Sequence, residues 1–299
     1  MMLPLILVLQ PLLISTIDSV LLILNVLRTA NTHAHCFSHA DLLILLFQLY
    51  AVEKNESALI ILRNLVKDPL FSDVTIVDSD MRDWQPPEKA DILVSELLGS
   101  FSDNELSPEC LDGAQRLLKA DGLSVPSEYT SYVAPLSSRK LYNNVVTQGQ
   151  QSPGENASHM GYVVRLQGVH ILDEVKTCFK FEHPKHDQVI DNSRHVSLEF
   201  DTSIDTVLHG FAGYFDAKLY RDVHISIHPD THSKDMFSWF PMFFPIKEPL
   251  LLRKGDKIIL DFWRVIDDTK VWYEWALSKP APQPIHNSRG VTYWIGLFS

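Results

Sequence analysis

Glycine is absent from the first third of this chain: of 12 glycines in 299 residues, the first is Gly99. Glycine alone adopts positive φ freely and lets a ligand approach the backbone closely. A glycine-rich nucleotide-binding turn is therefore excluded before residue 99. Lysine and arginine are also missing before Arg28. A secretory signal begins with a basic region, so the opening segment lacks one feature of such signals.

Cysteine is scarce as well. The three cysteines, Cys36, Cys110 and Cys178, are too few and too far apart for a disulfide framework or a cysteine-based metal cluster. They fit a reducing compartment. Histidines gather at residues 33–39 and 183–186 without cysteines at ligand spacing, and we therefore expect no metal site.

A surplus of basic residues is also lacking, since the formal net charge is −11. This excludes a general nucleic-acid-binding surface and suits a basic partner or substrate. A content of 45% hydrophobic and 21% charged residues is that of an ordinary globular protein. The length allows one large domain or two modest ones.

Residues 1–48 form an apolar segment that differs from the rest of the chain. Residues 1–27 contain a single charged residue, Asp18, and Pro11 interrupts the run. A membrane-spanning helix needs about 20 uninterrupted apolar residues. We favour one or two helices and a buried strand on the flank of a parallel sheet, whose strands are continuously apolar. A targeting or anchoring segment is the alternative, although we expect no membrane partner.

Residues 49–126 alternate between strand and helix patterns. Strands are predicted over 49–52, 74–77 and 92–94, a helix over 56–66 with Asn55 as its N-cap, and a second helix from Ser107 to Gly122. This alternation predicts a parallel, doubly wound, Rossmann-like sheet.

Three acidic residues follow three different predicted strands: Glu53, Asp80 and Glu96. Parallel strands present their carboxyl ends at one edge of a sheet, so these carboxylates are expected to line a single crevice. An acid in such a position can accept both ribose hydroxyls of an adenosyl group. The simpler alternative is that each acid caps the helix that follows it.

Residues 127–299 have a different pattern. Alternating strands are predicted over 195–200, 206–214, 223–227, 257–265 and 271–277, a polar loop over 149–161, and no helical period. This predicts an antiparallel β-barrel or sandwich. The fold class is thus α/β followed by all-β, with a Rossmann-like region over 49–126 and a β-barrel domain over 127–299.

The loop from Asp91 to Glu105 brings two carboxylates, Glu96 and Glu105, close together in the sequence. Two carboxylates suit a planar guanidinium, whose fork of donors stays protonated. Trp239 could stack on such a cation. Beside an adenosyl sulfonium, the reaction would be methyl transfer by in-line displacement. The alternative is that Ser102 and Glu105 form a capping box.

The motif from Ser95 to Ala114, SELLGSFSDNELSPECLDGA, strongly resembles the double-glutamate loop of the type II, symmetric-dimethylating protein arginine methyltransferases. Further pieces similar to that family are LYAVEKN at 49–55, SDMRDW at 79–84, LHGFAGYF at 208–215, MFSWFP at 236–241 and VWYEWA at 271–276. The likeness runs from residue 49 nearly to residue 299.

The resemblance implies a Rossmann-like methyltransferase domain, a β-barrel carrying dimer contacts, and S-adenosyl-L-methionine as cofactor. It implies the following roles: Glu96 and Glu105 hold the substrate arginine, Glu53 binds the ribose, Asp80 and Met81 bind the adenine, and Leu98, Ser238 and Trp239 line the arginine channel. The expected substrates are arginine-rich proteins such as histones and RNA-binding or splicing proteins, in the cytoplasm and nucleus.

The chain also departs from this family. The family's glycine-rich turn is replaced by NVLRTAN at residues 25–31, and the preceding helices and amino-terminal barrel are missing, so its WD-repeat partner is expected to be lost. Two alternatives to an active methyltransferase follow. One is an inactive, methyltransferase-like interaction module, and the other is a secreted or membrane-anchored chain.

Overall fold

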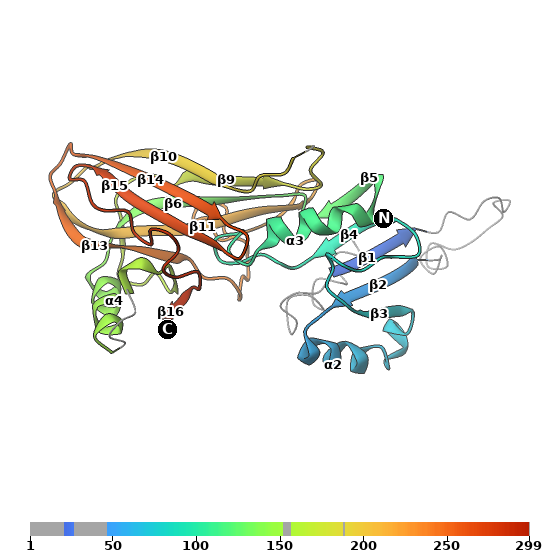
Figure 1. Ribbon diagram of the computed structural model, residues 1–299. Coiled ribbons are helices and arrows are strands. Elements are labelled where there is room, and N and C mark those ends of the chain that lie inside the picture. The colour runs from blue at the N-terminus through green and yellow to red at the C-terminus, as the bar shows by residue number, and fades with distance from the viewer. Residues whose placement is uncertain (1–20, 27–46, 152–156, 188, 299) are drawn as a thin grey trace. The chain divides into compact units, whose positions relative to one another are not determined.

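The computed structural model describes residues 21–26, 47–151, 157–187 and 189–298 (Figure 1). The predictions for residues 1–20 and 27–46 lie outside the described residues. They include most of the segment NVLRTAN, which stands in place of the family's glycine-rich turn. The chain divides into two compact units: unit 1 holds residues 1–97, 109–127 and 183–187, and unit 2 holds residues 98–108, 128–182 and 188–299.

Unit 1 is built on a five-stranded sheet of order β3-β2-β1-β4-β5. The strands are β1 (Leu21–Val26), β2 (Phe47–Glu53), β3 (Val74–Asp78), β4 (Ala90–Ser95) and β5 (Leu118–Val125). β2 is parallel to β3 and β4 is parallel to β5, whereas β1 runs antiparallel to both β2 and β4.

The position and direction of β1 correct the prediction of a fully parallel sheet flanked by a buried strand. β1 lies in the centre of the sheet, and Leu21 pairs with both Val52 and Ser95, while Val26 pairs with Phe47. Its carboxyl end is thus at the edge opposite to Glu53. A continuous apolar run indicates burial on both faces, but it contains no information about the direction of the strand.

The helices of unit 1 follow their local signals to different extents. α2 (Glu56–Leu65) begins as predicted after Asn55, whose side-chain oxygen accepts hydrogen bonds from the amides of Ser57 and Ala58 at 2.9 and 3.3 Å. α3 (Ser107–Ala114) starts at the predicted residue but is shorter than expected. After the turn η3 (Gln115–Leu117), the chain enters β5, so Gly122 lies within a strand. Pairing with β4 overrides the local helical pattern there.

Unit 2 contains two sheets that stack on one another (Figure 1). The larger has eight strands: β6 (Glu128–Ser137), β7 (Tyr162–Val164), β8 (His170–Ile171), β9 (Lys176–Glu182), β11 (Thr206–Tyr220), β12 (Val223–Ser226), β13 (Met242–Leu252) and β16 (Gly296–Phe298). The smaller has three: β10 (Arg194–Asp201), β14 (Lys257–Ile266) and β15 (Val271–Lys279). All pairs are antiparallel except β16 with β7, which confirms the predicted antiparallel character.

An unpredicted helix interrupts this unit. α4 (Arg139–Gln151) lies where we expected no helical period and overlaps the start of the predicted polar loop at 149–161. The turn η4 (Ala157–His159) follows it. Leu141 and Val145 are the buried residues of α4. Their spacing of four residues is helical, but two apolar contacts in a polar segment are a weak signal.

The core of unit 2 is aromatic. Phe244 on β13 and Phe262 on β14 have ring centroids 5.0 Å apart at an angle of 85°, so the two sheets meet through edge-to-face contacts. Phe101, from the loop before α3, enters this cluster and contacts Phe244 at 5.1 Å and Tyr273 at 5.5 Å. Such pairs stabilise a core beyond the area that they bury.

Among the described residues, no helix combines the length and hydropathy that a membrane crossing requires.

Candidate functional site

Two of the predicted acids lie at the same edge of the sheet of unit 1. Glu53 ends β2, Glu96 directly follows β4, and both strands run antiparallel to β1. β2 and β4 therefore point the same way, and their carboxyl ends flank Leu21, the first residue of β1. The sequence inference that these carboxylates share one edge of the sheet is confirmed, although it placed no strand between the two that carry them.

Glu53 is buried, with 2% of its surface exposed. Its Oε1 accepts hydrogen bonds from the backbone amides of Lys54 and Asn55 at 2.7 and 2.6 Å. Charge-assisted bonds of this kind fix the orientation of the carboxylate. The side chain is thus held in place by the start of the turn that leads into α2.

Asp80 follows β3 and sits between two cations. Arg82 donates from Nε and Nη2 at 2.9 and 2.7 Å, and Lys54 donates from Nζ at 2.9 Å. The Arg82 guanidinium holds the pKa of the Asp80 carboxyl well below its usual range, with a further contribution from Lys54. Asp80 is therefore ionised, and it links the turns after β2 and β3.

The backbone after β3 is held by Arg116. Its guanidinium donates to the carbonyls of Arg82 and Trp84, each at 2.7 Å. The carbonyl of Met81 accepts from the same guanidinium at 3.4 Å, and Met81 is 9% exposed. Sequence reasoning missed Lys54 and Arg116, because nothing local shows that a basic residue will bond a neighbouring loop. It also missed Arg82, which bonds Asp80 within the same turn.

The loop at residues 98–107 in unit 2 carries Glu105 on a tight turn. Gly99 and Ser102 exchange two backbone hydrogen bonds at 3.1 and 2.9 Å, and the side chain of Asn104 accepts from the Phe101 amide at 2.6 Å. That side chain fills the space in which a Cβ on residue 99 would lie. Glycine is therefore needed at position 99 for close packing.

Glu105 lies outside α3, two residues before its start at Ser107. In a capping box the glutamate is the third residue of the helix, so the capping alternative is wrong. Its side chain is exposed and borders a cavity of about 360 Å³ within unit 2. Other walls of this cavity come from Trp272, Tyr293 and Trp294.

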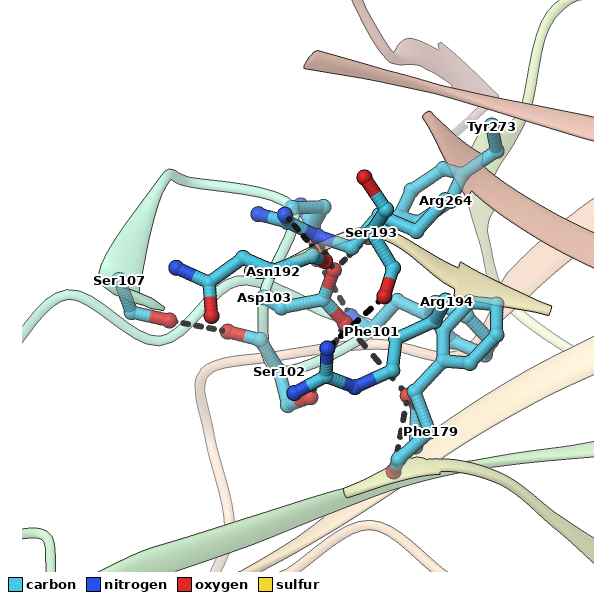
Figure 2. A network of polar contacts seen from close by, with 12 residues as sticks. Phe101, Ser102, Asp103, Ser107, Phe179, Asn192, Ser193, Arg194, Arg264 and Tyr273 are labelled. Atoms are coloured by element: carbon cyan, nitrogen blue, oxygen red, sulfur yellow. Dashed lines mark hydrogen bonds and ion pairs between the residues drawn. The ribbon is translucent and has the colours of Figure 1, made fainter. Parts of the chain in front are cut away.

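Asp103, two residues before Glu105, is the centre of a buried polar network (Figure 2). Its Oδ2 accepts from Arg264 Nε at 2.6 Å and from the Tyr273 hydroxyl at 2.7 Å. The side chains of Asp103 and Arg264 are both 0% exposed. A buried charge requires a partner, and here the partners come from β14 and β15. The sequence offered no signal for this pairing, which joins residues 161 positions apart.

The predicted channel residues of unit 2 meet at the other end of the same loop. Trp239 donates from its indole nitrogen to the carbonyl of Leu98 at 2.6 Å, and its ring contacts Phe215 edge-on at 5.8 Å. The backbone of Trp239 has φ of 57°, an uncommon value for a large residue. Ser238 is half-buried beside it. Leu98 is buried, and its carbonyl accepts the bond from Trp239.

The two glutamates of the predicted clamp are contributed by different units, Glu96 by unit 1 and Glu105 by unit 2. Within the described ranges, no group of three or more His, Cys, Asp or Glu side chains is arranged to hold a metal ion. Cys110 and Cys178 are free thiols, and burial raises the pKa of both.

Comparison with known families gives two adjoining matches. The PRMT5 arginine-N-methyltransferase family model matches residues 27–125, and the PRMT5 oligomerisation domain model matches residues 128–295.

Three curated proteins illustrate the similarity. Protein arginine N-methyltransferase 5 of Xenopus laevis is 55% identical over 251 residues, which cover 84% of this chain and 40% of that protein. The Drosophila melanogaster protein of that name is 50% identical over 260 residues, 86% of this chain and 42% of that protein. Protein arginine N-methyltransferase skb1 of Schizosaccharomyces pombe is 42% identical over 275 residues, 84% of this chain and 43% of that protein. The chain thus spans about two fifths of the length of these relatives.

Solved structures share the fold at lower identity. The Trypanosoma brucei PRMT1 enzyme-prozyme heterotetrameric complex with AdoHcy matches with a TM-score of 0.63 and 17% identity, covering 76% of this chain and 75% of that one. Arabidopsis thaliana protein arginine methyltransferase 10 matches with a TM-score of 0.59 and 18% identity, covering 78% and 80%.

Proposed function

We propose, on the premise that this chain belongs to the PRMT5 arginine-N-methyltransferase family, that it methylates the guanidinium of arginine in basic protein substrates. S-Adenosylmethionine is the proposed cofactor. The observation that carries the proposal is the placement of Glu53 and Glu96 at one edge of the sheet, where open α/β sheets bind their ligands. The net charge of −11 suits substrates that are rich in arginine.

The residues at this edge fit the proposed cofactor by their chemistry. Glu53, buried and oriented by two amides, is a suitable acceptor for ribose hydroxyls. Adenine is a flat ring with polar edges. Met81 offers a buried apolar side chain for such a ring, and the ionised Asp80 is its neighbour in the chain. We assign Glu53 to the ribose and Asp80 with Met81 to the adenine. When bound, this cofactor supplies an electrophilic methyl group on a sulfonium.

Glu96 and Glu105 are the proposed ligands of the substrate guanidinium. Each carboxylate accepts hydrogen bonds from its nitrogens, which fixes the plane of the group and draws positive charge away from the nitrogen that attacks. Catalysis is then mainly positional and electrostatic. Leu98, Ser238 and Trp239 are assigned to the channel that admits the side chain. The hydrogen bond from Trp239 to the Leu98 carbonyl supports this assignment, because it brings two of these three residues together.

The test is calorimetric titration of the chain with S-adenosylmethionine, followed by transfer of a labelled methyl group to an arginine-rich peptide. We expect saturable cofactor binding and label on arginine. Absence of binding at millimolar cofactor would overturn the enzymatic proposal. A chain that still binds the peptide under those conditions would then act as a methyltransferase-like interaction module.

We also propose that the chain self-associates through unit 2. The match of residues 128–295 to an oligomerisation domain supports this. For the same unit we propose the barrel form of the β fold, with its two sheets enclosing the aromatic core around Phe244 and Phe262.

A further inference from the structure

We propose that Asp103, Arg264 and Tyr273 are positioning residues that set the place of Glu105. This inference deepens the proposed function and rests on it for the role of Glu105. The three side chains form a polar network inside unit 2, two residues along the backbone from the exposed carboxylate of Glu105. None of the three is assigned here to contact with substrate or cofactor.

The network attaches the loop to the sheet behind it by short, charge-assisted bonds. Arg264 Nε and the Tyr273 hydroxyl both donate to Asp103 Oδ2, at 2.6 and 2.7 Å. Arg264 also donates from Nη1 to the carbonyl of Asn192 at 3.1 Å (Figure 2). The guanidinium is thus fixed at two points, and Arg264 lies opposite Tyr273 in the antiparallel pair of β14 and β15. A displaced loop would leave a fully buried charge unpaired, which is strongly unfavourable.

The backbone around Asp103 is held in an uncommon conformation. Ser102 and Leu106 both have φ of 64°, in the left-handed region that residues other than glycine seldom adopt. Such conformations persist where the surroundings fix them. Here those surroundings include the buried Asp103 side chain and the Phe101 ring in the aromatic core.

Glu105 lies between these fixed points and the start of α3. Leu106 N donates to the carbonyl of Asp103 at 3.3 Å, which closes the turn around residues 104 and 105. The carboxylate itself is exposed and borders the cavity of unit 2. The network therefore constrains the main chain of Glu105.

The decisive variant is Tyr273→Phe, which removes the hydroxyl and keeps the ring in the core. Tyr162→Phe is the matched control, because the Tyr162 hydroxyl is also buried in unit 2 and also makes a 2.7 Å bond, to the carbonyl of Ala157. We expect Tyr273→Phe to lower the melting temperature at least as much as Tyr162→Phe, because the acceptor of the Tyr273 bond is charged. Only Tyr273→Phe should lower kcat, by about ten- to a hundredfold, since displacements of about 1 Å cost rates on that order.

A second measurement tests the route through Glu105. In a Glu105→Gln background, Tyr273→Phe should have little further effect on kcat, because residues that act as a unit are non-additive. If the losses of kcat multiply in the double variant, or if Tyr162→Phe loses as much kcat as Tyr273→Phe, the network only stabilises the fold and does not position Glu105.

Amide hydrogen exchange separates this inference from the proposed function. Tyr273→Phe should speed exchange at residues 98–107 by about tenfold relative to Tyr162→Phe, since opening free energies are local. Equal exchange in the two variants would overturn the positioning role, whatever the turnover. Selective loosening in a chain that shows no methyl transfer would support the positioning role and refute the enzymatic one.

Discussion

Among single residues, the acids of the candidate site differ in how deeply they are buried: Glu53 is 2% exposed, whereas Glu105 is exposed. Asp80 is engaged by Arg82 and Lys54, and Glu53 by two backbone amides. Glu105, by contrast, is exposed at the tip of its loop. Carboxylates oriented by hydrogen bonds suit the proposed cofactor-binding roles of Glu53 and Asp80, and an exposed carboxylate suits the proposed substrate contact of Glu105.

Replacement of Glu96 tests the proposed substrate contact. Glu96→Gln keeps the shape of the side chain but removes its charge, so we expect kcat to fall by about a hundred- to a thousandfold, as for other groups that stabilise developing charge. The calorimetric affinity for S-adenosylmethionine should change little. Glu182→Gln, at an exposed carboxylate paired with Lys180, is the control. Turnover retained in Glu96→Gln would refute the role.

His286 makes the stability of unit 2 depend on pH. Its Nδ1 bonds the Trp275 carbonyl at 3.1 Å and its Nε2 accepts from the Lys247 amide at 2.8 Å, which suits a neutral ring. Burial lowers the pKa of His286 from 6.5 to about 4, with smaller contributions from His159 and Lys247. The unfolded state binds the proton first as pH falls, so this contribution to stability is complete above about pH 6.5 and is lost toward pH 4.

We therefore expect the free energy of unfolding in urea to drop between pH 7.5 and pH 5, with about 2 kcal/mol of the loss due to His286. His286→Gln should remove that share of the pH dependence. His195→Gln, at an exposed imidazole, should leave it unchanged. An unaltered pH profile in His286→Gln would contradict the assignment.

Among the elements, the conformation of the loop at residues 98–107 depends on the close packing of Gly99 against the Asn104 side chain. Gly99→Ala would place a Cβ against Asn104, whose side chain cannot move freely because it accepts the Phe101 amide. We expect a loss of about 1–3 kcal/mol in the free energy of unfolding, the usual cost of overpacking, and a lower kcat. In Gly99→Ala/Asn104→Ala the steric part should be relieved. Additive losses in a double-mutant cycle would argue against the clash.

The strands and helices show where local patterns suffice. The Asn55 cap, the Ser107 start of α3 and the alternating strands of unit 2 are local signals, and all are confirmed. Local patterns did not predict the direction of β1, the strand β5 or the helix α4. Each of these three depends on a neighbouring element, which no window of a few residues contains.

At the scale of the whole molecule, self-association is the property to measure. We expect sedimentation velocity at 150 mM salt to give a mass at least twice the 34.1 kDa of the single chain. Moderate salt screens the repulsion between chains of net charge −11, because the Debye length falls to about 8 Å. A single-chain mass at every micromolar concentration would contradict the proposed assembly through unit 2.

Composition, periodicity and motifs are enough to identify the family, the antiparallel character of unit 2, and the strand ends that carry Glu53 and Glu96. Three features are visible only in the folded chain: the antiparallel direction of β1, the position of Glu105 outside a capping box, and the burial of Asp103 against Arg264 and Tyr273. The physical reason is separation along the chain. Burial can be read from one segment, whereas strand direction and ion pairing require two segments that meet only in the folded protein.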